Sequence, residues 1–193
     1  MAQEQLNIFL SASIPILGRD EKYHKTADPI AIRDSILALA SVALLKYKLI
    51  WGGHPSITPL IANILRHSEQ DIQSRVTLYQ SIYFEKFFPL ENESVAHIIK
   101  TSDLGTKALS LEYMRKRMLG DNQFYAGIFI GGMEGVEVEY NMFTELHPKA
   151  KIFPIASTGA AAKIIYDKYF NGQEPQLYSN LAYSSLFKDL LSI

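Results

Sequence analysis

The segment Tyr125-Ala-Gly-Ile-Phe-Ile-Gly-Gly-Met-Glu-Gly-Val-Glu-Val-Glu139 predicts a buried strand, a glycine turn and a helix in direct succession. Its apolar opening, Ile128-Phe129-Ile130, is typical of a strand in a sheet interior. Gly131-Gly132 and Gly135 interrupt it, and helical spacing then runs from Val136 to Leu146. This order presents unpaired backbone N–H groups to an anion, and glycine permits the positive φ and close approach that such a turn requires.

A second segment of the same kind lies upstream. Lys48-Leu-Ile-Trp-Gly-Gly-His-Pro-Ser-Ile-Thr-Pro59 leads into a helical pattern over Leu60 to His67. One such turn is weak evidence, because glycines commonly only punctuate loops. Two of them in a small domain favour a nucleotide-type site between them, so we expect the bends at Gly53 and Gly132 to share one pocket.

The composition bounds the class of protein. The chain has 193 residues, of which 48% are hydrophobic and 20% charged, as in an ordinary globular protein. We predict a single domain over residues 1–193, since the sequence has no internal repeat, low-complexity tract or linker. The net charge of −1 does not favour direct binding of nucleic acid. The absence of cysteine excludes disulfides, cysteine-based zinc sites and a thiol nucleophile.

The N-terminal segment and the longest apolar stretch bear on localisation. Met1-Ala-Gln-Glu-Gln5 is polar and lacks the features of a signal peptide. The apolar-rich segment Ile36 to Leu45 is too short and too interrupted to span a bilayer. We therefore expect a cytoplasmic protein without membrane contact.

Predicted strands and helices alternate along the chain. The strands are expected over 6–10, 48–51, 75–79, 97–100, 126–130 and 151–155. The helices are expected from Asp28-Pro29 to about Leu44 and over 56–67, 83–88, 105–118, 136–146, 160–170 and 186–191, and 14–27 as a long loop. This alternation predicts an α/β fold, a three-layer sandwich whose mainly parallel sheet carries helices on both faces.

Small or polar residues follow the predicted strands. Ser11, Gly52-Gly53, Gln80-Ser81, Gly131-Gly132 and Ser157 each stand at such a point. In open parallel sheets, ligands bind outside the C-terminal strand ends at the switch in strand order. These residues are therefore expected to share one edge of the sheet and to form a binding site there.

The two glycine turns together resemble the SLOG superfamily of Rossmann-like nucleotide binders, and the similarity spans Ile8 to Leu191. That superfamily includes the lonely-guy phosphoribohydrolases, the DNA-processing protein A fold, the sensor region of some TRPM channels and the sensors of several bacterial antiphage systems. Phe9-Leu-Ser-Ala-Ser-Ile-Pro15 and Ala27-Asp-Pro-Ile-Ala-Ile-Arg-Asp34 are similar to the prokaryotic sensor branch. The resemblance implies a Rossmann-like fold.

The lonely-guy enzymes carry an Arg on a helix followed by a Pro-Gly-Gly-x-Gly-Thr-x-x-Glu turn, and Arg and Glu act on the N-glycosidic bond. Glu139 stands four residues after Gly135, as in that motif. The resemblance makes Arg115 or Arg117 the counterpart of the Arg, with the choice left open. Catalytic roles are expected for Glu139, Arg115 and Arg117 only if the chain is an enzyme.

The second turn also departs from that motif. Ile130 replaces the Pro, Val136 replaces the Thr, and one extra residue separates Gly132 from Gly135. An insertion in a tight phosphate turn changes which N–H groups point inward. The departures therefore affect the catalytic geometry, while a binding role remains.

The predicted ligand-binding residues lie in or beside the two turns and at the other strand ends. They are Ser11, Ser13, Arg33, Gly52, Gly53, His54, Ser56, Thr58, Gln80, Gly131, Gly132, Met133, Glu134, Gly135 and Glu139. Each also has a structural alternative, such as a cap for His54, a surface salt bridge for Arg33 and tight strand–helix packing for Gly131-Gly132. The aromatic residues Tyr79, Tyr83, Phe84, Phe87 and Phe88 are expected in the core or a lid, with stacking on a base as the alternative.

Three functions stay open at this stage. The first is a sensor that binds a nucleotide-derived small molecule, such as a cyclic ADP-ribose isomer or a cyclic oligonucleotide, and acts as a homo-oligomer or through a separate effector protein. The second is an N-glycosidase, and the third is a structural partner without a ligand. No cofactor is expected, and no metal, because the 5 histidines show no paired spacing.

Overall fold

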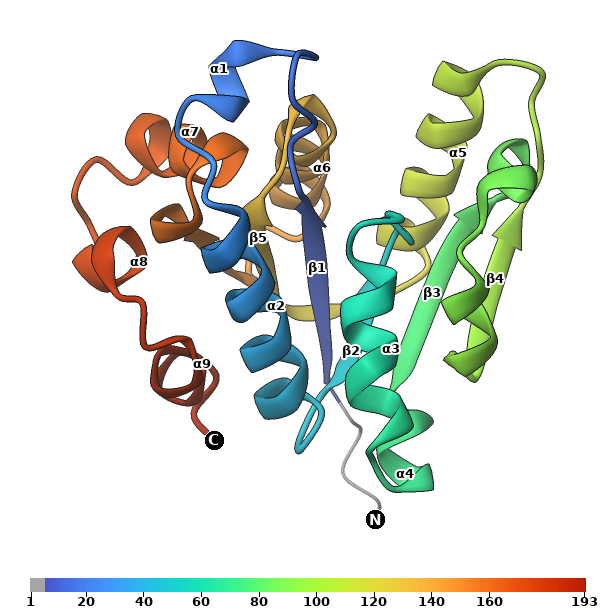
Figure 1. The fold of residues 1–193 in the computed structure, drawn as a ribbon, viewed down its shortest axis with the longest axis horizontal. Helices are drawn as coiled ribbons and strands as arrows, with labels where there is room; N and C mark the ends of the chain where they lie inside the picture. Colours follow the sequence, from blue (N-terminus) through green and yellow to red (C-terminus); the bar gives the residue numbers. More distant parts are fainter. Residues whose placement is uncertain (1–5) are drawn as a thin grey trace.

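The computed structural model describes residues 6–193, which form a six-stranded, all-parallel sheet of order β4-β3-β2-β1-β5-β6 (Figure 1). The segment Met1–Gln5, where a signal peptide was not expected, lies outside the described residues. The strands are β1 (Asn7–Ser13), β2 (Lys48–Trp51), β3 (Val76–Ser81), β4 (His97–Thr101), β5 (Phe124–Gly131) and β6 (Lys151–Ile155). The predicted parallel sheet is confirmed, with a strand at each expected place.

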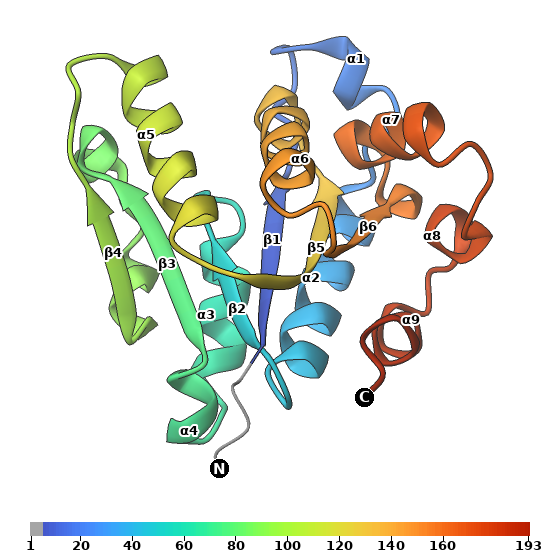
Figure 2. The same ribbon diagram turned by 180° about the vertical axis from the view of Figure 1, so that it is seen from behind.

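Helices cover both faces of the sheet, as predicted (Figures 1 and 2). One face carries α2 (Pro29–Ala43), α3 (Thr58–Arg66) and α9 (Tyr183–Leu191), and the other carries α5 (Lys107–Gly120), α6 (Glu134–Leu146) and α7 (Ala160–Tyr169). The shorter helices are α1 (Glu21–His24), α4 (Gln70–Gln73), α8 (Pro175–Ser179) and the 3-10 helices η1 (Ile82–Phe87), η2 (Leu90–Ser94) and η3 (Ala156–Thr158). The fold is thus a Rossmann-like three-layer α/β sandwich.

The alternation of side chains along β1 explains the two cores. Ile8 and Leu10 pack under α2 and α9, while Phe9 points to the opposite face. There the Phe9 ring stacks on Phe143 of α6, with ring centroids 5.3 Å apart. A strand buried on both faces needs apolar residues at consecutive positions, which is the pattern that β1 and β5 carry.

Helix α2 begins where the sequence predicts. The Asp28 side chain accepts hydrogen bonds from the N–H groups of Ile30 and Ala31, each at 3.0 Å. Pro29 occupies the first helical position, where its missing N–H costs nothing. This cap ends the connection from β1 and sets the direction in which α2 crosses the sheet.

Two local predictions need correction, and a third, the short helix expected over 83–88, is confirmed and refined in type. Residues 14–27 were expected to be loop throughout, but they contain α1, whose Tyr23 is buried. β1 extends to Ser13 because Ser11 and Ser13 pair with Phe129 and Gly131 of β5, so Ser11 lies within the strand. The aromatic segment forms the 3-10 helix η1, which ends before Pro89.

The order of the strands reverses between β1 and β5, because the chain returns from β4 to the other side of β1. At this point the N–H of Gly132 donates to the carbonyl of Ser13 over 2.8 Å and joins the two strand ends. No helix of residues 6–193 combines the length and apolar character needed to cross a membrane.

Candidate functional site

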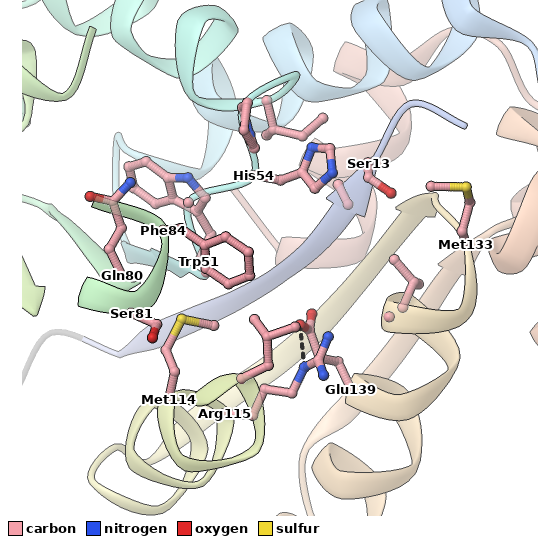
Figure 3. Close-up of a pocket in the computed structure, with 18 of the residues that line it drawn as sticks. Ser13, Trp51, His54, Gln80, Ser81, Phe84, Met114, Arg115, Met133 and Glu139 are labelled. Carbon is pink, nitrogen blue, oxygen red and sulfur yellow. Dashed lines mark hydrogen bonds and ion pairs between the residues drawn. The ribbon is translucent and has the colours of Figure 1, made fainter. Parts of the chain in front are cut away.

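A cavity of about 290 Å³ opens at the C-terminal edge of the sheet (Figure 3). Its walls come from the ends of β1, β2 and β3, from η1, from one face of α5 and from the first turns of α6. Both glycine-containing segments contribute to it, through Gly52, Gly53 and Gly135. The Gly53 bend therefore lies at the cavity, whereas the Gly132 bend, which was expected to share it, contributes only through the residues that follow it, Met133 to Gly135.

The first turn, Gly52-Gly53-His54, leaves its N–H groups available. Gly53 has φ +69°, and a Cβ there would lie 2.7 Å from Leu78 Cδ1 and 2.8 Å from Gln80 Cγ. Only glycine fits this conformation and this space. The N–H groups of Gly52 and Gly53 donate no hydrogen bond to any residue of the described chain.

His54 presents one ring nitrogen to the cavity. Its Nδ1 accepts a hydrogen bond from the Ser56 N–H at 3.2 Å and lies 2.8 Å from Ser56 Oγ. Because Nδ1 accepts, the proton of the neutral ring is on Nε2, which has no partner within residues 6–193. Burial lowers the pKa of His54, the Glu139 carboxylate opposes this shift, and the Arg19 guanidinium adds to it. His54 is therefore a neutral N–H donor at pH 7.

The second turn uses its first two N–H groups to hold the fold. Gly131 donates to Thr158 Oγ1 over 2.9 Å, and Gly132 donates to the carbonyl of Ser13 over 2.8 Å. Gly131 and Gly132 have φ values of +54° and +87° and do not line the cavity. The expected anion contacts through these two N–H groups are therefore not available, because both groups already have acceptors.

The N–H groups that remain open follow one residue later. Met133, Glu134 and Gly135 begin α6 and line the cavity, and no residue of the described chain accepts a hydrogen bond from their N–H groups. No side chain caps this helix. The first N–H groups of an α-helix lack partners within the helix and carry its positive dipole end, so they favour an anion.

Arg115 and Glu139 form an ion pair beside that helix start (Figure 3). Arg115 Nε lies 3.0 Å from Glu139 Oε1, and Ser11 Oγ donates to Glu139 Oε2 over 2.6 Å. The two side chains are only 14% and 13% exposed. The Nη groups of Arg115 donate to no part of the described chain, and a Cβ on Gly135 would lie 3.0 Å from Nη2. Gly135 thus makes room for a guanidinium with free donors.

The model of the SLOG cluster3 family matches residues 22–191, most of the chain. The chain belongs to the SLOG cluster3 family. The predicted resemblance to the SLOG superfamily is therefore confirmed, and with the observed fold it identifies a Rossmann-like domain of a nucleotide-related family. A search of curated proteins finds no match.

In this SLOG cluster3 protein, the structure separates the two candidate arginines. Arg117 points away from the cavity, is 46% exposed and pairs with Asp121 over 2.6 Å. Of the two arginines left open by the resemblance, Arg115 is the one that lines the cavity. Arg33 also lies outside the site, where it pairs with Asp34 over 2.8 Å on the exposed side of α2.

Three predicted residues support the site from behind. Ser11 holds Glu139, and Ser56 holds the ring of His54. Thr58 is buried, with its Oγ1 3.4 Å from the indole nitrogen of Trp51. None of the three serine and threonine side chains lines the cavity, so their expected direct contact with a ligand becomes a positioning role.

The remaining predicted residues do reach the cavity. Ser13, Gln80 and Met133 line it, and the Ser13 hydroxyl has no hydrogen-bond partner in the described part of the chain. The sequence predictions missed Arg19 and Met114, which also line it. Met114 and Arg115 share a face of α5 with Leu111, and the position of Arg19 in the long loop after β1 was a usable signal.

The loop after β1 is tied to the first turn of α6. Arg19 pairs with Glu134, Lys22 pairs with Glu137 over 2.9 Å, and the Tyr23 hydroxyl donates to the same carboxylate. These contacts keep the loop at the mouth of the cavity. No cluster of His, Cys, Asp or Glu within residues 6–193 has the makings of a metal site.

Proposed function

We propose that this SLOG cluster3 protein is a sensor that binds a nucleotide-derived signal in the cavity at the sheet edge. The observation that carries the proposal is the convergence of two sets of unpartnered backbone N–H groups on one cavity, at Gly52-Gly53 and at Met133–Gly135. Arg115 adds uncommitted guanidinium N–H groups beside the second set. This combination fits a phosphate, whose oxygens accept several hydrogen bonds and whose charge is stabilised at a helix N-terminus.

The charges around the cavity are consistent with an anion. Glu139 is balanced by Arg115, and Glu134 is balanced by Arg19. The neutral ring of His54 offers an N–H without adding negative charge. A phosphate at the start of α6 would therefore meet donors from the main chain and from Arg115, while both nearby carboxylates are already paired.

The size of the cavity also bears on the ligand. At about 290 Å³ it lies near the lower end of the roughly 300–1,000 Å³ that is usual for small-molecule sites. This volume suits one nucleotide unit. A cyclic ADP-ribose isomer or one unit of a cyclic oligonucleotide is the ligand class that we favour, and the resemblance to antiphage sensors supports a role in bacterial antiphage signalling. Output would come through oligomerisation or a partner effector.

Binding without turnover is the simpler reading of Glu139. Its Oε1 accepts from Arg115 and its Oε2 accepts from Ser11. A carboxylate that steadies charge at an anomeric carbon must present an oxygen to the sugar. Glu139 lines the cavity, and its bonds to Arg115 and Ser11 hold the guanidinium in place beside Gly135.

The experiment is isothermal titration calorimetry with AMP, CMP, NAD, cyclic ADP-ribose and a cyclic dinucleotide. We expect at least one to bind, and Arg115→Met to weaken that binding by at least about tenfold. Arg117→Met is the matched control, because Arg117 is exposed and outside the cavity. Absence of binding by every compound, or equal effects of the two variants, would contradict the proposal. Size-exclusion chromatography with light scattering, with and without the bound compound, tests output through assembly.

The Arg115–Glu139 pair in the cavity supports a second candidate, an N-glycosidase that acts on a nucleotide monophosphate or an NAD-type substrate. Hydrolysis would release free base from AMP, CMP or NAD, which chromatography detects. If the protein is an enzyme, Glu139→Gln abolishes this release. Tight binding with no released base favours the sensor.

A further inference from the structure

The cavity has a second end, away from the start of α6. Figure 3 shows Gln80, Trp51 and Phe84 on the side of the cavity opposite Ser13 and Met133. The first group comes from β2, β3 and η1, and Gln80 lies against Gly53 of the first glycine turn. This end of the cavity presents the amide of Gln80 among aromatic rings, whereas the other end presents the charged and main-chain donors around Arg115.

Gln80 is a buried amide with one uncommitted half. Its side chain is 3% exposed and lines the cavity. The Gln80 Oε1 accepts a hydrogen bond from Asn92 Nδ2 over 2.8 Å, whereas Nε2 donates to no residue of the described chain. The Nε2 atom is open to the cavity and not sealed in the core, since the buried side-chain atoms without a partner in residues 6–193 are Ser35 Oγ and Asn92 Oδ1. A donor left open towards a cavity therefore points to an acceptor on a ligand.

The surroundings hold this amide in one orientation. Asn92 fixes Oε1 from one side. On the other side, a Cβ on Gly53 would lie 2.8 Å from Gln80 Cγ and 3.0 Å from Nε2, so the glycine provides the space that the side chain occupies. The free N–H groups of Gln80 are thus presented to the cavity by a rigid frame.

The rings beside Gln80 form an apolar wall. Phe84, Phe87 and Phe88 of the η1 segment line the cavity together with Trp51. Aromatic faces of this kind stack on nucleobases and tolerate any base. Stacking therefore supplies affinity here, and a directional group such as Gln80 is required for discrimination.

We propose that Gln80 is a specificity-determining residue that reads the base of the bound nucleotide, with the base against the Phe84 wall. This inference rests on the proposed function. If the phosphate lies near Arg115, the base extends towards Gln80. The edge of the base that is farthest from the ribose then faces Gln80. The Gln80 Nε2 then donates to an acceptor on that edge, a keto oxygen or a ring nitrogen.

The test compares bases whose remote edges have opposite hydrogen-bond polarity. Dissociation constants of AMP, IMP, CMP and UMP are measured by calorimetry for the wild type, Gln80→Glu and Gln80→Met. On that edge AMP and CMP carry an amino donor beside a ring-nitrogen acceptor, whereas IMP and UMP carry a keto acceptor beside a ring N–H donor. Gln80→Glu replaces the Nε2 donor by an acceptor, so we expect the preferred member of each pair to be inverted, with the ratio moving by at least about tenfold. Gln80→Met should bring both ratios to within about threefold of unity.

Three controls separate the possible failures. Gln70→Glu adds the same charge at an exposed position of α4 and should leave the preference unchanged. Arg115→Met should weaken all four nucleotides alike. Thermal unfolding checks that each variant is folded. A wild type that binds none of the four contradicts this inference, and it contradicts the phosphate site as well only when NAD, cyclic ADP-ribose and the cyclic dinucleotide also fail to bind. Binding whose preference is unmoved in both Gln80 variants contradicts the role of Gln80 alone.

Discussion

The two glycine turns, Gly52-Gly53 after β2 and Gly131-Gly132 after β5, have the same sequence signature and different uses. The N–H groups of the first turn have no acceptor in residues 6–193 and line the cavity. The N–H groups of the second turn bond to Thr158 Oγ1 and to the carbonyl of Ser13, and they join β5 to its neighbours.

This difference shows that a glycine pair after a strand does not by itself mark a phosphate cradle. In the second turn the extra residue before Gly135 separates two functions, since the pair fixes the backbone and the open N–H groups follow at Met133–Gly135. A substitution at Gly132 should therefore affect folding, whereas the same substitution at Gly52 should chiefly affect binding.

The largest effect is expected for Gly132→Ala. Gly132 has φ +87°, and a Cβ there would lie 2.2 Å from Val136 Cγ2. We expect the free energy of unfolding to fall by about 3 kcal/mol or more, measured by urea denaturation. Gly52→Ala is the comparison, because its Cβ would meet flexible methionine side chains, Met114 Cε at 3.3 Å and Met118 Cε at 3.7 Å. It should cost less than about 1 kcal/mol, and equal losses at the two turns would break the contrast.

Arg115→Met is expected to have the next largest effect. It leaves the Glu139 carboxylate, 13% exposed, with Ser11 as its remaining hydrogen-bond donor. Unfolding in urea should show a loss of about 1–3 kcal/mol. Adding Glu139→Gln to this variant should recover part of that loss, because the unpaired charge is removed. No recovery in the double variant would argue against the pair as the source of the effect.

Gly135→Ala sharpens the comparison within the second turn. Gly135 lies in the first turn of α6, and alanine is the better helix former, so stability should be unchanged or rise by up to about 1 kcal/mol. Phosphate affinity should nevertheless fall several-fold, since the new Cβ would lie 3.0 Å from Arg115 Nη2 and displace the guanidinium. The matched control is Gly120→Ala at the end of α5, where a Cβ meets nothing within 4 Å. A similar change of affinity in Gly120→Ala would remove the argument.

The smallest effect concerns His54 in the first turn. Burial lowers its pKa, so the folded state takes up this proton at lower pH than the unfolded state, whose histidines titrate near 6.5. As pH decreases, stability falls wherever the unfolded state binds more protons than the folded state. The stabilisation due to neutral His54 is therefore lost as pH drops through about 6.5. His54→Gln should reduce the decline in the free energy of unfolding between about pH 7.5 and 5.5, measured by urea denaturation at each pH. His67→Gln, an exposed histidine, serves as the control, and identical pH profiles of the wild type and His54→Gln would exclude this role.

The sequence was sufficient to predict the three layers of the fold, because the spacing of apolar residues in long segments shows which face of each helix or strand is buried. It did not show α1, since the four residues Glu21–His24 are too few for a periodic signal. It also did not show which N–H groups stay open. That depends on acceptors distant in the chain, Thr158 and Ser13, which only the folded backbone brings to Gly131 and Gly132.

The candidate site was predicted in part for the same reason. Glycines and strand-end residues such as Gly53 and Gln80 were placed by topology alone. The choice between Arg115 and Arg117 required the rotation of α5 about its axis, which two nearby arginines do not reveal. The side chain of Arg33 was assigned to the site from its place near the start of α2, but Asp34 binds it on the exposed side.

The bond between Gly132 and the Ser13 carbonyl closes the sheet at the point where its strand order reverses. The cavity therefore sits to one side, over β1, β2 and β3, and takes none of its lining from β6 or α7. We therefore expect substitutions along β3 and η1 to alter ligand binding without disturbing the bond between Gly132 and Ser13. The residues that line this part of the cavity and the residues that join β5 to β1 are different, so the two can change independently.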